Sequence, residues 1–148
     1  MSATRVAFVD NLVCVNRKMR TLFDARAKEL GLTQSRARLL LALAQEEGIT
    51  QTQLAAALDI EQPSLVGLLD GLEKLGSITR QADPDDRRSK RIYLTDQARA
   101  EAGGLLAFSA SLRQQILEGI PDEELSVASR VLATVFQNIT GASGEASS

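Results

Sequence analysis

Residues 50–95 read TQTQLAAALDIEQPSLVGLLDGLEKLGSITRQADPDDRRSKRIYLT, and this stretch decides the fold. Leucines recur in its first half at three- and four-residue steps, which indicates two short amphipathic helices. Thr50 and Gln53 have the spacing of a capping box at the start of the first helix. Pro63 lies where a helix begins, and there its missing N–H is no loss. The pattern therefore predicts two helices joined by a tight turn at residues 59–61.

The hydrophobic period changes immediately after these helices. Residues 77–81 and 91–94 alternate between apolar and polar side chains in the manner of strands. The segment between them, residues 82–89 with the sequence ADPDDRRS, is polar and rich in turn formers. Two helices followed by a hairpin with a charged tip are the element order of a winged helix-turn-helix, whose second helix can enter the major groove of DNA.

The charge distribution agrees with this interpretation, although the formal net charge of the whole chain is −2. Residues 80–91 carry five basic side chains against three acidic ones, whereas residues from 101 onward carry two against six. Only the face that contacts DNA has to be positive. The charges of the hairpin therefore predict a basic stripe that contacts DNA. The alternative is a run of charged residues that only faces solvent.

Long apolar helical patterns flank the central stretch, and the 148 residues predict one domain. Residues 5–31 and 96–140 are expected to form dimerisation helices around a DNA-binding lobe at residues 33–95. Their broad apolar faces exceed what so small a lobe can cover, so a partner chain is expected. Residues 141–148 are small and polar, and we expect them to be a disordered tail.

Several segments together resemble the MarR family of transcription regulators, most closely its SlyA subgroup. They are IEQPSLV at 60–66, LEKLG at 72–76, DRRSKRIYLT at 86–95, GLTQ at 31–34 and EGIPDEEL at 118–125. The resemblance extends from about Leu12 to Ile139 in the family's order of elements. It implies a mainly α fold with a small β-hairpin, a winged helix-turn-helix of six helices in an intertwined homodimer. It also implies a pseudopalindromic double-stranded operator.

The resemblance also assigns roles to residues of the DNA-binding lobe. Arg88 matches the wing arginine that enters the minor groove, and Asp86 matches the acidic residue that steadies it. Arg87 would contact phosphate or share the groove. The recognition helix would begin at Gln62, Pro63 and Ser64, with Lys90 in the wing and Thr50 and Gln51 as supporting contacts. Gly67 departs from the SlyA-like pattern, which has a basic residue there, so the operator preference is expected to differ.

Family members are typically repressors released by small aromatic acids or, in some branches, by CoA thioesters. The resemblance therefore implies an anionic ligand near the first two helices, with a candidate pocket formed by Arg17, Arg20, Arg36, Ala37 and Arg38. Arg36 and Arg38 are two residues apart and project from different sides of a helix. Taken singly, each arginine is expected to be a surface residue or a phosphate contact.

Two alternative functions remain open from the sequence. Cys14 could make the protein a thiol-based redox-sensing repressor, since one branch of the family senses peroxide through a cysteine on the first helix. It lies about one helical turn from the matching position, however, and Tyr93 is the only tyrosine. A cysteine among apolar neighbours is more often a buried small residue. The other alternative is a winged-helix protein-interaction module without DNA binding, although such modules often lose the wing arginines.

An enzyme is not expected from this sequence. It contains no histidine, which leaves no histidine base and no histidine-based metal site, and it has no glycine-rich phosphate loop. We therefore expect neither cofactor nor metal. The single cysteine and the lack of an apolar leader or membrane-length run favour a cytoplasmic protein.

Overall fold

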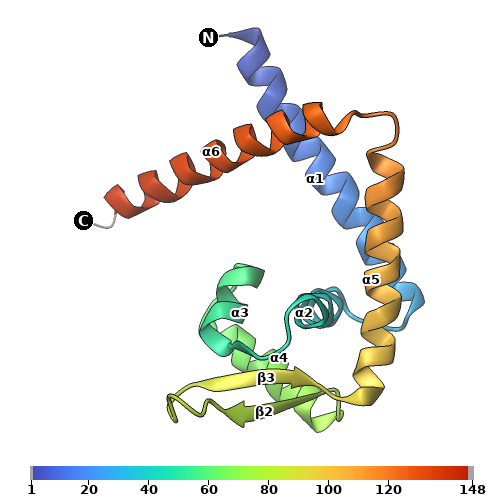
Figure 1. The fold of residues 1–148 in the computed structure, drawn as a ribbon, viewed down its shortest axis with the longest axis vertical. Coiled ribbons are helices and arrows are strands. Elements are labelled where there is room, and N and C mark those ends of the chain that lie inside the picture. The colour runs from blue at the N-terminus through green and yellow to red at the C-terminus, as the bar shows by residue number, and fades with distance from the viewer. Residues whose placement is uncertain (1, 147–148) are drawn as a thin grey trace. The chain divides into compact units, whose positions relative to one another are not determined.

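The computed structural model describes residues 2–146, without the side chains of 142–146. The described residues form six helices and three strands (Figure 1). In chain order these are α1 (Ala3–Glu29), α2 (Gln34–Gln45), β1 (Ile49–Thr50), α3 (Gln51–Leu58), α4 (Gln62–Lys74), β2 (Ile78–Ala82), β3 (Lys90–Leu94), α5 (Asp96–Ile116) and α6 (Asp122–Ala146). The chain divides after Ser111 into two compact units.

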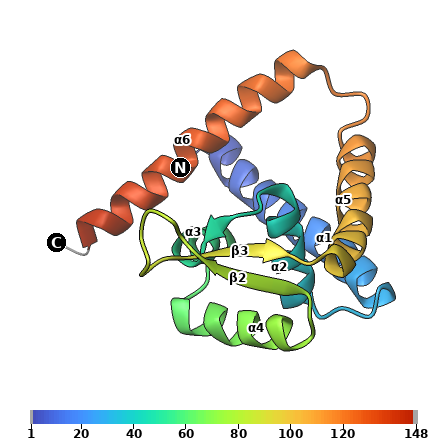
Figure 2. The same cartoon turned by 60° about the horizontal axis from the view of Figure 1, so that its bottom comes forward.

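The lobe of the first unit packs α2, α3 and α4 against an antiparallel sheet with the strand order β1-β3-β2 (Figure 2). The central strand β3 pairs Ile92 with Ile49 of β1 and Leu94 with Ile78 of β2. Burial of aliphatic side chains supplies most of the stabilisation of such a lobe. The largest fully buried side chains are Leu39, Leu40, Leu43, Leu54, Leu65, Leu69, Leu72, Ile78, Ile92 and Leu105.

Local hydrogen bonds explain where the helices of the lobe begin. The predicted capping box is confirmed, because Thr50 Oγ1 accepts from the Gln53 N–H at 3.2 Å and Gln53 Oε1 accepts from the Thr50 N–H at 3.1 Å. The predicted tight turn follows α3, where Asp59 adopts a left-handed conformation with φ 53°. Aspartate tolerates this conformation better than most residues, so the chain can turn at once into α4.

The predicted winged helix-turn-helix with six helices is confirmed, but the sheet contains a strand that the sequence did not reveal. Ile49 and Thr50 form β1, so the predicted hairpin is part of a three-stranded sheet. A two-residue strand is too short to show a period of two. It forms because β3 offers Ile92 and Arg91 as partners, which is a tertiary effect.

The C-terminal helix is longer than expected. The predicted disordered tail began at residue 141, whereas α6 continues to Ala146. Residues 141–146, GASGEA, contain no proline that would stop a helix. The Thr140 hydroxyl also bonds back to the Phe136 carbonyl at 3.0 Å, within the helix. Ser147 and Ser148 of the predicted tail lie outside the described residues.

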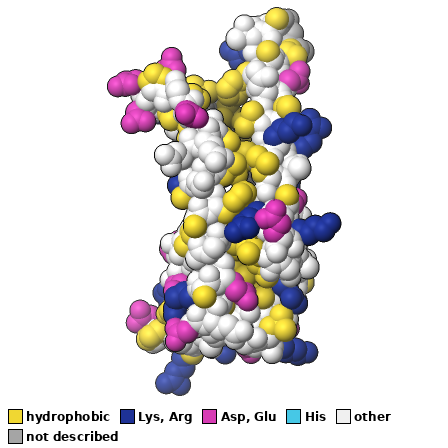
Figure 3. Space-filling view, turned by 90° about the vertical axis from the view of Figure 1, so that its right-hand side faces the viewer, with side chains coloured by type: hydrophobic (Ala, Val, Ile, Leu, Met, Phe, Trp, Pro, Cys, Tyr) yellow, Lys and Arg dark blue, Asp and Glu magenta, His cyan; other side chains and the backbone are white. Residues whose placement is uncertain are grey.

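The long helices leave many apolar side chains open to solvent. In α1 only Ala27 is buried, and Val9 and Val13 are 56% and 57% exposed. In α6 Phe136 is 67% exposed. Figure 3 shows apolar side chains at the surface of one face of the molecule. Across residues 2–146, no helix is sufficiently long and apolar to cross a membrane.

Candidate nucleic-acid interface

The first turn of α4 presents polar groups to solvent. Gln62, Pro63 and Ser64 are exposed, while Leu65 and Leu69 on the opposite face are buried in the core. No side chain caps the start of this helix, so its first N–H groups remain available to an external acceptor. The Gln62 amide donates to Thr52 Oγ1 at 3.3 Å, which steadies it across the turn. The predicted recognition-helix residues thus lie together on an open surface.

The wing tip is shaped by two aspartates. Asp83 is buried and accepts a hydrogen bond from the Asp85 N–H at 3.0 Å. Asp86 Oδ1 accepts from the Arg88 N–H at 3.0 Å, and the Asp86 carbonyl accepts from the Ser89 N–H at 3.0 Å. Aspartate commonly bonds the backbone two residues further on in this way, and the bond closes a turn. Asp86 therefore holds the backbone of Arg88, whose side chain is exposed.

The basic stripe counted from the sequence is smaller in the structure. Arg80 pairs with Asp70 and with Glu73 of α4, the latter at 3.4 Å. Arg91 pairs with Asp83 at 3.1 Å and donates to the Gly48 carbonyl at 2.7 Å. These two arginines are structural, because carboxylates distant in sequence lie next to them. In the described part of the chain, Arg87, Arg88 and Lys90 form no ion pair and are exposed.

Arg80 holds a structural position whose partners the sequence analysis did not reveal. Its side chain is only 19% exposed, and it joins β2 to two carboxylates on the solvent side of α4. It thereby ties β2 to α4, two elements that lie next to each other in Figure 2. No local pattern in the sequence could have shown this pairing, because the residues belong to different elements. Asp83, by contrast, could have been found from its spacing to Asp85 at a turn.

The supporting residues Thr50 and Gln51 lie at the start of α3 and are both partly buried. The Thr50 hydroxyl oxygen is already used as the helix cap. Its first role is therefore structural, and its hydroxyl proton remains available to an outside acceptor.

The five candidate ligand residues differ in their exposure, and of the five only Arg38 lines the small cavity of the lobe. Arg17 and Arg20 are exposed on α1, and Arg36 is partly buried on α2. Ala37 is fully buried in the core, which corrects its assignment to a pocket wall. Arg38 donates to the Leu58 carbonyl at 3.3 Å.

Arg38 also borders a small cavity in the lobe. Its volume is about 30 Å³, and its lining is Ser35, Arg38, Leu58, Ile60 and Leu68. Pockets for drug-sized ligands have volumes of about 300–1,000 Å³, so this cavity is large enough for a water molecule but too small for an aromatic acid.

Cys14 is exposed in the single chain, so the expectation of a buried cysteine is wrong at this level of assembly. The reason is the sparse packing of α1, whose main contacts with the lobe are with α2.

Acid is expected to loosen the wing through Asp83. The Asp85 N–H and, secondarily, the Arg91 guanidinium hold the pKa of Asp83 below its ordinary value of 3.8, although burial opposes them. A depressed folded-state pKa contributes stability that is complete above pH 3.8 and is lost as the pH falls through the lower folded value. Thermal melts between pH 7 and pH 2 should therefore show a fall in melting temperature in acid, and this fall should be smaller in Asp83→Asn than in the wild type. An identical acid profile in the variant would contradict this role of Asp83.

Comparison with known proteins agrees with this geometry. The sequence model of the MarR family matches residues 30–89. The transcriptional regulator PA3341 is 37% identical, with 90% of this chain and 98% of that chain covered and a TM-score of 0.82.

Two more distant structures show the same fold. The transcriptional regulator SlyA is 22% identical, with 90% and 94% of the two chains covered and a TM-score of 0.75. A putative MarR family regulator from Listeria monocytogenes, solved in complex with 26mer DNA, is 20% identical, with 88% and 87% covered and a TM-score of 0.77. The family match within the DNA-binding lobe and the 37% identity to a regulator over nearly its whole length show that this chain belongs to the MarR family of transcriptional regulators.

Proposed function

We propose that the protein is a sequence-specific regulator that binds double-stranded DNA as a homodimer. The observation that carries the proposal is the pairing of two features on one lobe. One is the exposed polar start of α4, and the other is a wing whose Arg87 and Arg88 have no carboxylate partner among the described residues. Because the other two arginines of the hairpin are neutralised, the free charge is concentrated at the wing.

Each feature has a matching partner on DNA. The start of α4 suits the major groove, where the Gln62 amide can bond a base edge and the helix N–H groups can bond a phosphate. Exposed arginines suit narrow minor grooves, whose negative potential attracts them. Gly67 lies on the exposed side of α4, and a side chain built there would meet no atom within 4 Å. Its missing side chain therefore supports an operator preference different from that of relatives with a basic residue there.

The homodimer is supported by the uncovered helices. α1 and α6 expose many large apolar side chains, whereas an ordinary monomer exposes such side chains singly and scattered over its surface. A two-fold symmetric dimer would cover them and present two recognition helices to a pseudopalindromic operator. The proposal includes membership of the SlyA subgroup, which the shared sequence segments support, and action in the cytoplasm, where the DNA lies.

The proposal extends to repression that a small aromatic acid or its CoA thioester relieves. This extension rests on the family membership, since the cavity that Arg38 lines is too small for such a ligand. If no aromatic acid or acyl-CoA weakens operator binding, the protein is regulated in another way.

Fluorescence anisotropy with the intergenic DNA beside the protein's own gene tests the proposed function. We expect tight, sequence-selective binding that weakens steeply between about 50 and 200 mM salt, because phosphate contacts release counterions. A scrambled duplex of the same length and composition is the control. Equal, weak binding to both duplexes would favour the alternative, a winged-helix module that binds protein.

A further inference from the structure

Glu47 lies in the loop between α2 and β1 and completes the edge of the sheet. The Ile92 carbonyl of β3 accepts from the Gly48 N–H at 2.8 Å, and β1 begins at the next residue, Ile49, so Glu47 lies just before the strand. Leu94, two residues after Ile92, points its backbone groups to the same edge. Glu47 Oε1 accepts from the Leu94 N–H at 2.9 Å. A side chain therefore supplies the hydrogen bond that a longer β1 would have made.

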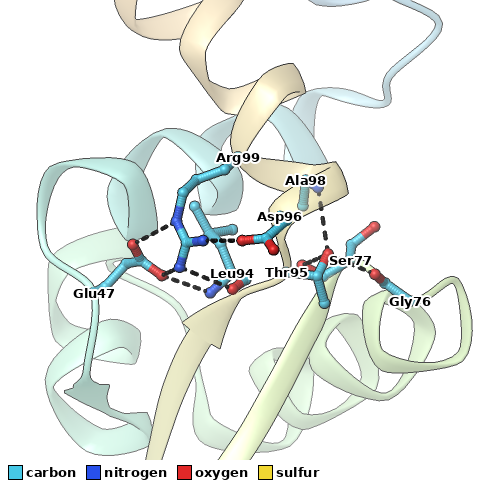
Figure 4. A network of polar contacts seen from close by, with 8 residues as sticks. All are labelled: Glu47, Gly76, Ser77, Leu94, Thr95, Asp96, Ala98 and Arg99. Atoms are coloured by element: carbon cyan, nitrogen blue, oxygen red, sulfur yellow. Dashed lines mark hydrogen bonds and ion pairs between the residues drawn. The ribbon is translucent and has the colours of Figure 1, made fainter.

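Arg99, in the first turn of α5, grips the same carboxylate (Figure 4). Its Nη2 lies 2.9 Å from Glu47 Oε1 and its Nε lies 3.1 Å from Oε2, which is a bidentate contact. Nη2 also donates to the Leu94 carbonyl at 3.3 Å, and Nη1 donates to Asp96 at 2.6 Å. Arg99 and the Leu94 N–H together lower the pKa of Glu47, against a smaller effect of burial. One guanidinium thus joins α5 to the end of the wing strand and to the loop before β1.

Thr95 holds the other side of this junction (Figure 4). Its hydroxyl donates to the Gly76 carbonyl at 2.7 Å, just after α4, and accepts from the Ala98 N–H at 3.3 Å in α5. Thr95 is the only residue between β3 and α5. The direction in which α5 leaves the lobe is therefore set by the burial of Ala98, Ala102 and Leu105 in the core together with two polar contacts, Thr95 on one side and the Glu47–Arg99 pair on the other.

The exposure of the Glu47–Arg99 pair indicates what it contributes. The side chains are 29% and 49% exposed. Ion pairs this open to solvent stabilise a fold little, since water screens them. A bidentate fork nevertheless fixes orientation strictly. The pair is thus better suited to set the angle between α5 and the lobe than to stabilise the fold.

We propose that the Glu47–Arg99 bridge positions the DNA-binding lobe on α5 and thereby sets the half-site spacing that the homodimer reads. This inference rests on the proposed function. A helix of 21 residues such as α5 is about 30 Å long. A change of roughly 10° at one end displaces the other by about 5 Å, which exceeds the base step of about 3.4 Å. Glu47 and Arg99 are positioning residues and do not themselves touch DNA.

In-vitro selection from a random duplex pool tests the inference directly. Wild-type protein, Glu47→Ala and Arg99→Ala are each used to enrich sequences, and the distance between half-sites is compared. Glu46→Ala is the matched control, because it removes the same charge from the neighbouring exposed residue. We expect one spacing for wild type and Glu46→Ala, and a spacing shifted or broadened by at least about one base pair for the other two. Arg99→Lys, which keeps the charge without the fork, should also broaden it.

A merely structural role would weaken binding to all operators equally and leave the selected spacing unchanged, and that result overturns the inference.

A second measurement needs no DNA. Spin labels at Ala57→Cys on α3 and Ala107→Cys on α5, in a Cys14→Ser background diluted with unlabelled chain, report the distance between lobe and α5. We expect the wild-type distance between the two labels to have a narrow distribution, which broadens or shifts in Arg99→Ala. An unchanged distance distribution overturns the positioning role.

The two measurements separate this inference from the proposed function. If wild-type protein enriches no sequence, the proposed function fails and the claim about half-site spacing fails with it. The label distances still decide whether the bridge positions the lobe.

Discussion

Replacing Arg88 with alanine is expected to weaken operator binding about 5- to 140-fold, which corresponds to about 1–3 kcal/mol. The side chain is exposed and forms no ion pair with the side chains of residues 2–141, while its backbone N–H is held by Asp86. The wing thus delivers an arginine whose charge is not already neutralised. Its loss removes a groove contact without removing any contact that stabilises the lobe.

Anisotropy titrations on the selected operator measure this loss, and sedimentation shows whether the oligomeric state has changed. Arg113→Ala is the control, because Arg113 is an exposed arginine that belongs to α5 and not to the wing hairpin. We expect the control to bind like wild type and both variants to sediment as wild type does. Wild-type affinity in Arg88→Ala would mean that the wing does not contact DNA.

Replacing Leu69 with alanine is expected to lower the free energy of unfolding by about 2–5 kcal/mol. Leu69 is fully buried on the inner face of α4, within the core that holds the recognition helix. The substitution removes apolar burial and leaves a cavity that the surrounding leucines fill only in part. Since the free energy of unfolding of small proteins is about 5–15 kcal/mol, this one change removes a large part of it.

Urea unfolding followed by circular dichroism measures the effect. Val66→Ala is the matched control, because Val66 lies on the same helix but is 36% exposed. Val66→Ala should lower the free energy of unfolding by less than about 1 kcal/mol, as is usual for substitutions away from the core. Equal destabilisation by both substitutions would mean that α4 is not anchored through the face that the structure buries.

The sequence by itself determined the elements that local physics controls. Leucine spacing predicted α3 and α4, and the spacing of Thr50 and Gln53 predicted a capping box that the structure contains. The turn-rich segment between two alternating stretches predicted the wing. These features involve residues within a few positions of one another, so helix period, caps and turn chemistry suffice to predict them.

The tertiary structure alone decided which polar groups are free. The hairpin offers several arginines that look equivalent in the sequence, yet Arg80 is neutralised across elements by α4 and Arg91 is tied to Asp83. The two-residue strand β1 exists only because β3 lies beside it.

The same reason explains Ala37 and Glu47. Ala37 was assigned to a ligand pocket, but the packing of α2 buries it. Glu47 reaches Leu94 and Arg99, which are far away in the chain. Burial and ion pairing depend on which elements meet in the folded lobe. A local pattern does not contain that information, because the partners are brought together only by the packing of the core.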